Sequence, residues 1–156
     1  MICAYQQISH WLAETGTSLG VEFNLSDDGY CRMISEDDIV LTIVAEHSSE
    51  MFRVFIDIMP IPHDGHLQVY EGLLVMNLDQ GYTGGASMAL DIPSSMIVLS
   101  YIRQVEDTSF TQFSNLIQNL LVISNKIISD MNPENIMLEE LLKKASANIT
   151  TPMLQV

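Results

Sequence analysis

Hydrophobic and polar positions along the chain change their spacing several times, and each change predicts a new element. Over residues 2–15 the apolar positions recur every three or four residues, which is typical of a helix with one buried face, and Gly16 suits its C-terminal end. A short alternating run follows at Val21–Leu25. Three longer runs with a spacing of two, joined by short polar turns, then predict an antiparallel meander. These strands are Tyr30–Ser35, Ile39–Glu46 and Met51–Met59.

The last strand of the meander indicates how its sheet is covered. One face of that strand is wholly apolar, with Phe52, Val54, Ile56 and Ile58. The other face mixes apolar residues with Arg53 and Asp57, whereas a sheet with one face in water would show a cleaner alternation. Both faces of the sheet are therefore expected to be at least partly covered.

The helix predicted after the meander is apolar on two sides. Proline at position 60 ends the strand, because proline cannot donate to a ladder, and a helical pattern then runs over His63–Leu78 with Asp64 as its N-cap. Its apolar residues form two stripes, one of Leu67, Tyr70, Leu74 and Leu78 and one of Val69, Leu73 and Met76. One side can face the sheet of its own domain. The simplest partner for the other side is the same helix in a second copy of the chain.

The remaining pattern predicts a loop, a hairpin and a long helix. The loop is Asp79–Ser87, and the hairpin strands are Met88–Ile92 and Met96–Arg103. Ser109 and Gln112 have the spacing of a capping box, which predicts a helix from there to about Met131.

A further short helix is expected at the C-terminal end. Asn132 and Pro133 suit a helix start, and the helix would run over Glu134–Ala147, followed by a loose tail. The fold class is therefore a single α+β domain in the order α-β-β-β-α-β-β-α with an extra C-terminal helix. Its antiparallel sheet is twisted and flanked by helices. Residues 1–131 would form the domain proper, and residues 132–156 the added helix and tail.

Composition adds an excess of apolar surface to this picture. The chain has 156 residues, 47% of them hydrophobic and ten of them Met, yet its net charge is −14 from 20 acids and 6 bases. So much apolar surface in so acidic a domain indicates a protein partner or a second copy. The charge repels nucleic acid and anionic membranes, although solubility alone also explains it. The two cysteines are too few for a disulfide framework, no stretch is long enough to span a membrane, and the N-terminus lacks a signal peptide pattern. A protein of the reducing cytoplasm is expected.

No group of residues in the sequence forms a catalytic or metal-binding pattern. His63 and His66 lack a third and fourth ligand nearby. The glycines around Gly84 are not followed by the Lys-Ser/Thr of a phosphate-binding loop. Neither cysteine has the local signature of a nucleophile. The chain is therefore expected to be neither an enzyme nor dependent on a cofactor or metal.

The order of elements, the acidity and several stretches resemble the class I chaperones of bacterial type III secretion, the Tir-chaperone-like family. The stretches that carry the resemblance are Leu19–Val21, Asp27–Met33, Leu73–Leu78, Met88–Ile92 and Met96–Leu99. The resemblance covers roughly residues 2–131. It implies a nucleotide-independent homodimer that binds an extended segment near the N-terminus of a secreted effector and keeps it secretion-competent.

The resemblance also implies two sets of contact residues. The dimer would form through the helix after the meander, with Leu67, Val69, Tyr70, Leu73, Leu74 and Met76. The effector would contact apolar residues of the first helix and the strands, namely Ile8, Trp11, Leu12, Met33, Leu41, Ile43, Met51, Phe55 and Met88. Contact with the secretion ATPase stays open. So does a second function, that of an acidic inhibitor or immunity protein that neutralises a basic toxin.

Overall fold

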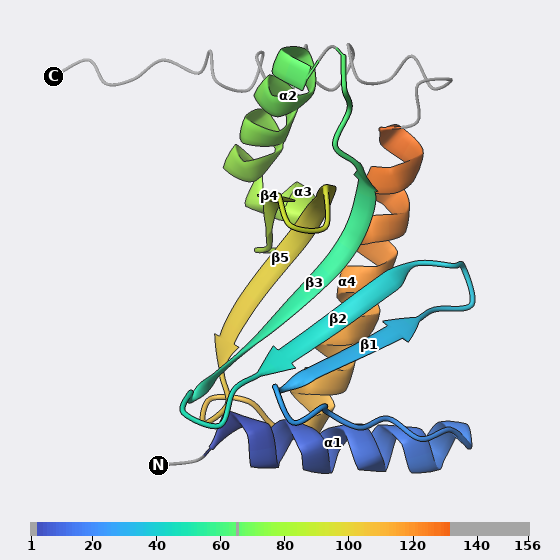
Figure 1. The fold of residues 1–156 in the computed structure, drawn as a ribbon, viewed down its shortest axis with the longest axis vertical. Coiled ribbons are helices and arrows are strands. Elements are labelled where there is room, and N and C mark those ends of the chain that lie inside the picture. Colours follow the sequence, from blue (N-terminus) through green and yellow to red (C-terminus); the bar gives the residue numbers. More distant parts are fainter. Residues whose placement is uncertain (1–2, 65, 132–156) are drawn as a thin grey trace, which may run out of the picture.

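The computed structural model describes residues 3–64 and 66–131, and the predicted C-terminal helix and tail lie outside them. A five-stranded antiparallel sheet is combined with a long helix at each end of the described chain and a shorter helix between (Figure 1). The elements in order are α1 (Ala4–Leu19), β1 (Tyr30–Ile34), β2 (Val40–Ala45), β3 (Met51–Pro60), α2 (His66–Leu78), α3 (Gln80–Thr83), β4 (Ser87–Asp91), β5 (Met96–Gln104) and α4 (Phe110–Asp130). The predicted α+β class and element order are confirmed, with α3 as a one-turn addition.

The sheet has the strand order β1-β2-β3-β5-β4, so β1 and β4 are its two edges. Every pair of neighbouring strands is antiparallel. Across the three central strands, Leu41 pairs with Ile56 and Ile56 pairs with Leu99. Since side chains alternate between faces, these residues lie on one face of the sheet. A register shift between Asp57 and Met59 bends the end of β3.

The core lies between one face of the sheet and the helices. In Figure 1, α4 runs behind β2 and β3, and α1 crosses the end of the sheet. Phe113 of α4 joins the three layers, because its ring lies 5.2 Å from that of Trp11 in α1 and 5.7 Å from that of Phe52 in β3. Phe52 and Ile56 have no exposed surface, so this face of β3 is sealed as its pattern predicted.

The second face of the sheet, called the open face below, has no helix across it among the described residues (Figure 1). It carries one cross-strand row of Tyr30, Val44, Arg53 and Ile102 and a neighbouring row of Arg32, Thr42, Phe55 and Ser100. Val44 is nevertheless only 4% exposed, because it lies between the long side chains of Tyr30 and Arg53 in its row. The partial cover predicted for this face comes from neighbouring side chains rather than from a helix.

The first helix is longer than predicted, and the short strand after it is absent. Gly16 does not end α1, which continues to Leu19 and closes at Gly20 in the left-handed conformation with φ 72°. Gly16 is buried because the chain folds back over it, with the N–H of Val21 donating to the Gly16 carbonyl at 3.0 Å. Residues 21–25 form an irregular segment with no partner strand, although Leu25 at its end enters the core.

The long C-terminal helix of the described chain starts where its sequence predicts. The Ser109 hydroxyl accepts from the Gln112 N–H, and the Gln112 carboxamide accepts from the Ser109 N–H at 2.8 Å, so both halves of the capping box are present. This start fixes the side of α4 that meets the sheet, where Phe113, Leu120 and Ile127 are buried.

Candidate functional site

An apolar groove of about 290 Å³ lies between α1, α4 and the β1–β2 hairpin. Its lining comes from separate parts of the chain. Helix α1 contributes Leu12, Thr15 and Leu19, the irregular segment after it Phe23, β1 Met33 and Ile34, the turn after β1 Ser35 and Glu36, β2 Leu41 and Ile43, and α4 Phe113, Ser114, Ile117, Gln118 and Leu121. Helical spacing explains both walls, since residues three, four or seven positions apart share one helix face. The floor is the pleated face of the sheet.

The groove is closed at its floor and apolar at its mouth. Leu41 and Ile43 are no more than 2% exposed, so the floor is packed, and Leu12 of the α1 wall is equally buried at 1%. Leu19 is 65% exposed and Ile34 68% exposed, each at the rim. Large apolar side chains in water at the edge of an apolar groove are typical of a binding surface rather than of a core.

Strand β1 forms the edge of the sheet beside this groove. Residues Tyr30–Ile34 pair with β2 on one side only. On the other side Ser26 already occupies the main-chain groups of Tyr30, since its N–H donates to the Tyr30 carbonyl at 2.8 Å and its hydroxyl accepts from the Tyr30 N–H at 3.1 Å. By the alternation of an antiparallel ladder, a further strand could pair with the outward groups of Arg32 and Ile34. The groove and the free edge therefore lie together, so an extended peptide could use both at once.

The turn between β1 and β2 is tied to α4 at the end of the groove. The amide nitrogen of Asn125 donates to the carboxylate of Asp37 at 2.8 Å, and the N–H of Ser35 donates to the carbonyl of Ile39 at 2.9 Å. The bond between Asn125 and Asp37 sets the separation between the hairpin and the helix, because it joins groups 88 residues apart. Together the two bonds hold Glu36 at the rim of the groove.

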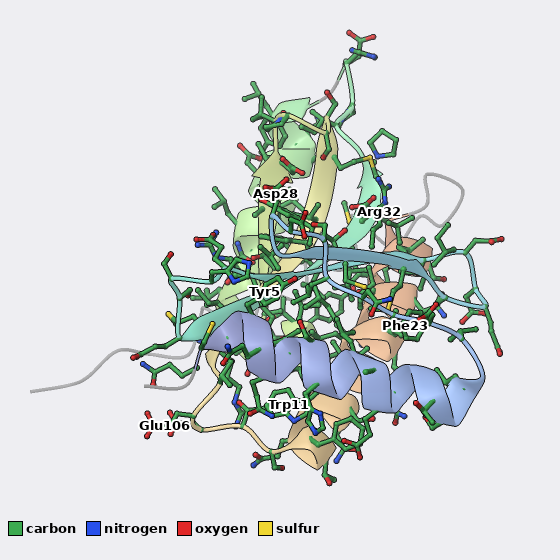
Figure 2. All side chains as sticks on the ribbon, turned by 60° about the horizontal axis from the view of Figure 1, so that its bottom comes forward. Tyr5, Trp11, Phe23, Asp28, Arg32 and Glu106 are labelled. Atoms are coloured by element: carbon green, nitrogen blue, oxygen red, sulfur yellow. The ribbon has the colours of Figure 1, made fainter. Side chains whose placement is uncertain are left out.

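The predicted effector-contact residues divide into three groups. Leu12, Met33, Leu41 and Ile43 line the groove. Ile8 and Trp11 are buried in the core behind it (Figure 2 labels Trp11 on α1), and Met88 is buried beside α2. Met51 and Phe55 lie on the open face, on the opposite side of the sheet from the groove. The structure thus brings four of the nine together.

Several residues of the groove were not anticipated from the sequence. They are Leu19, Phe23, Ile34, Ile117 and Leu121. Leu19 lies beyond the predicted end of the first helix, and Phe23 lies in the segment predicted as a strand. A signal was present in α4, where Phe113, Ile117 and Leu121 are spaced by four, but a wide apolar stripe does not reveal which part of it is left uncovered.

Helix α2 presents a second apolar surface, formed by Leu67, Leu74 and Leu78. These side chains are 69%, 71% and 66% exposed, and Glu71 is the one charged residue among His66–Leu78. Burial distinguishes the residues of the two apolar stripes predicted for this helix. Leu73 and Met76 pack into the core of their own chain, and Val69 and Tyr70 are half-buried against it.

The last turn of α2 covers part of the second sheet edge. The amide nitrogen of Asn77 donates to the Met88 carbonyl at 3.1 Å, and its oxygen accepts from the Met88 N–H at 2.6 Å. The side chain thereby satisfies both main-chain groups of one residue on the edge strand β4. At Met88 this edge is therefore closed to an added strand.

The buried Cys31 lacks the properties of a reactive thiol, and the described residues offer no metal site. Burial raises the pKa of the Cys31 thiol, and the hydrogen bond to the Asn24 backbone only partly offsets it, so the thiol stays protonated and unreactive. The described residues contain no group of three or more His, Cys, Asp or Glu side chains that could hold a metal ion. They also include no helix long and apolar enough to cross a membrane.

A free edge strand beside an apolar groove is an arrangement that domains use to bind extended segments of other proteins. The amino-acid sequence identifies the family to which the chain belongs. It matches the Tir chaperone protein (CesT) family over residues 10–126, which is most of its length, and the chain belongs to that family. This is a family of type III secretion chaperones and not of enzymes. A comparison with curated proteins by sequence finds no match.

Solved structures share the fold. The ExsC–ExsE complex matches with a TM-score of 0.67 and 14% identity, over 79% of this chain and 92% of that one. The HopA1–SchA chaperone–effector complex matches with a TM-score of 0.64 and 18% identity, over 83% and 98%. The Yersinia pestis type III secretion chaperone SycH, in complex with a fragment of YscM2, matches with a TM-score of 0.55 and 22% identity, over 76% and 98%. These likenesses confirm the fold predicted from the element order.

Proposed function

We propose that this protein is a homodimeric, nucleotide-independent chaperone of the bacterial cytoplasm that binds an extended N-terminal segment of a type III secreted effector. The segment is kept soluble and competent for secretion while it is bound. The observation that carries the proposal is the apolar groove beside the free edge of β1. Family membership and the complexes formed by proteins of the same fold support it.

Binding at this site would combine two kinds of contact. Main-chain groups of the segment pair with β1, which gives affinity with little dependence on sequence. Apolar side chains of the segment enter the groove over Met33 and contact Leu19 and Ile34 at its mouth, which gives selectivity. Ordering an extended segment costs free energy, so a long contact of this kind is required.

A second copy of the chain is the partner proposed for α2. Its exposed leucines Leu67, Leu74 and Leu78 form one stripe with a single nearby charge, Glu71. Two such stripes packed together would remove the largest apolar side chains of this helix from water. The predicted contacts of Val69 and Tyr70 would lie at the border of that surface, because both are half-buried.

No nucleotide is needed for binding of this kind, because the segment is held by apolar and main-chain contacts. The glycines that could suggest a phosphate site have a structural use. Gly84 closes α3 in the left-handed conformation with φ 63°, and its N–H donates to the Gln80 carbonyl rather than to a ligand.

The groove is tested by one substitution at its exposed rim. Ile34→Asp places a charge where the segment would pass, and the side chain is 68% exposed, so the fold should persist. Val122→Asp is the matched control, because Val122 is 71% exposed on α4 and does not line the groove. Effectors of the native host are produced singly, in full length and without their N-terminal region, and their capture by each variant is measured.

The expected result is capture of at least one full-length effector by the wild type and by Val122→Asp. Capture should be lost with the truncated effector and with Ile34→Asp. Equal capture by both variants, or capture that does not need the effector's N-terminal region, would refute the assignment of the groove. Circular dichroism of Ile34→Asp checks that the fold is intact.

Dimerisation is tested separately with Leu74→Asp. Leu74 is 71% exposed, whereas the adjacent Leu73 is 5% exposed and would disturb the core if changed. Light scattering after size exclusion should give a dimer for the wild type and for Val122→Asp and a monomer for Leu74→Asp. A wild-type monomer at micromolar concentration, or a dimeric Leu74→Asp, would contradict the role given to α2.

A further inference from the structure

The open face of the sheet contains a cavity of about 290 Å³ on the opposite side of the sheet from the groove. Its lining residues are Tyr30, Thr42, Val44, Arg53, Phe55, Asp57, Asp91 and Val98. The floor is apolar, since Val44 is 4% and Val98 3% exposed and Phe55 is half-buried beside them. A hollow with an apolar floor and charged walls is the usual form of a site that binds a side chain together with its charge.

Two carboxylates stand together at one end of this cavity. Asp57 of β3 pairs with Val98 of β5, and Val98 pairs in turn with Ala89 of β4. Asp91 lies two residues after Ala89, so it projects from the same face. Both acids therefore lie on the open face, on either side of Val98. Burial raises the pKa of Asp57, Arg32 counteracts this, and the negative charge of Asp91 raises that pKa further. The folded chain therefore brings the two carboxylates together without enough positive charge to balance them.

Each of the two arginines on this face lies near one acid, and for Arg32 that acid is Asp57 itself. Arg32 approaches Asp57 at 3.6 Å, but its side chain is 68% exposed, and Arg53 lies 4.0 Å from Glu46. Exposed pairs at such distances contribute little and exchange readily with water. Counting Asp91 with these two pairs, three carboxylates thus stand against two guanidinium groups, and Asp57, Asp91 and Arg53 are those that line the cavity.

We propose that the open face is a docking surface for an extended segment of another protein that carries a lysine or arginine two residues from an apolar side chain. The cation would lie between Asp57 and Asp91, and the apolar side chain would cover Phe55 and Val44. The spacing follows from the sheet, because Phe55 and Asp57 are alternate residues of β3, about 7 Å apart, and an extended segment repeats at the same interval.

Charge favours such a partner over the other candidates. The whole chain has a net charge of −14, so it attracts a basic segment and repels an acidic one, and a second copy of the chain would bring the same excess of negative charge. The surface is distinct from the groove and from the leucines of α2, since none of its lining residues belongs to either. Its one link to the proposed effector site is Tyr30, which belongs to β1.

The test uses the full chain with methyl-labelled valines and two blocked peptides of serine and threonine. One peptide carries a lysine and, two residues later, a phenylalanine, and the other has glutamate in place of the lysine. Titration should shift the methyl signals of Val44 and Val98 with the lysine peptide only. Asp57→Asn and Asp91→Asn should each weaken that response about tenfold, because each removes one charge at the cation site.

The matched control is Glu106→Gln, which removes the same charge from the turn before α4 (labelled in Figure 2) and should leave the affinity within about twofold. Should Asp57→Asn fail to fold, Asp91→Asn alone decides, since Asp91 is in the edge strand. An equal response to the glutamate peptide would overturn the proposal, as would shifts confined to valines elsewhere in the chain. Contacts of Val44 and Val98 with residues 132–156, or with a second copy, would overturn it as well.

Discussion

Two buried hydroxyl groups, those of Thr83 and Ser124, have no hydrogen-bond partner among the described residues. Both side chains are fully buried, so each hydroxyl has lost its water without a bond in return. We expect Thr83→Val and Ser124→Ala each to raise the free energy of unfolding by about 1 kcal/mol, because the apolar replacement removes this penalty. Urea denaturation measures the change.

Thr108→Val is the matched control for this prediction. Thr108 is also buried, but its hydroxyl donates to the Gln104 carbonyl at 2.8 Å, so the same exchange should cost about 1 kcal/mol. The two threonines should therefore give effects of opposite sign. A loss of stability in Thr83→Val as large as that in Thr108→Val would show that the Thr83 hydroxyl does hold a hydrogen bond.

Tyr82 is expected to make the stability sensitive to alkali. Its hydroxyl donates to the Asp130 carboxylate at 2.6 Å, and Lys126 lies over its ring at 4.6 Å. Burial, then the hydrogen bond and the charge of Asp130, raise the pKa of Tyr82 well above its ordinary value of 10.0. A raised pKa in the folded state stabilises the protein below pH 10, and this contribution is lost as the pH rises above 10.

Tyr82→Phe isolates this effect, because phenylalanine keeps the ring beneath Lys126 and cannot ionise. At pH 7 the variant should be less stable by about 1.5–3 kcal/mol, since a hydrogen bond to a buried carboxylate is removed. Between pH 10 and about 11.5 its stability should fall less steeply than that of the wild type. Denaturation curves at each pH measure both quantities, and parallel slopes for the two proteins would contradict the prediction.

The sequence predicts the role of a single residue best where that role depends only on residues close by in the sequence. The capping box of Ser109 and Gln112 depends only on their spacing, and the structure has it. Leu73 and Leu74 are adjacent and equally apolar, yet one is 5% and the other 71% exposed. Their difference depends on where α2 lies against β4, which no local pattern records.

At the scale of elements, strands were predictable where each run has a partner. Residues 21–25 alternate as a strand does, but no strand pairs with them, and the segment instead turns back over Gly16 of α1. Its Leu25 is buried all the same, so the pattern did indicate burial while misassigning the conformation. The groove could not be predicted as a unit, because its two helical walls lie far apart in sequence, as do Thr15 of α1 and Ile117 of α4.

The contact between α2 and β4 depends on Asn77, because this one side chain bonds both main-chain groups of Met88 on the edge strand. Asn77→Ala should lower the free energy of unfolding by about 2 kcal/mol, because two hydrogen bonds are lost in a partly buried place. The exposed edge should also make the variant more prone to aggregate. Chemical denaturation and light scattering measure the two effects.

Asn119→Ala is the control for Asn77→Ala. Asn119 is exposed on α4, and both changes replace asparagine with a better helix former, so their effects on helix propensity cancel in the comparison. The control should be neutral or slightly stabilising. If Asn77→Ala matched it, the clamp on β4 would contribute nothing to stability.

At the scale of the whole molecule, the net charge of −14 opposes the compact state. Folding brings the acids closer together than they are in the unfolded chain, and dissolved salt screens their repulsion over about 10 Å at 0.1 M. Raising sodium chloride from about 0.02 to 0.5 M should therefore stabilise the fold against urea, by on the order of 1 kcal/mol at fixed protein concentration.

A charge-reversed variant separates this screening from a general effect of salt on apolar burial. Asp28→Lys with Glu106→Lys changes two exposed turn residues, and because each exchange adds two positive charges the net charge becomes −10. The variant should respond to salt less than the wild type does, since less repulsion remains to be screened. An equal response would assign the effect to apolar burial, which salt strengthens in both proteins alike. The excess of acid would then bear on the choice of partners and on solubility, and not on the stability of the fold.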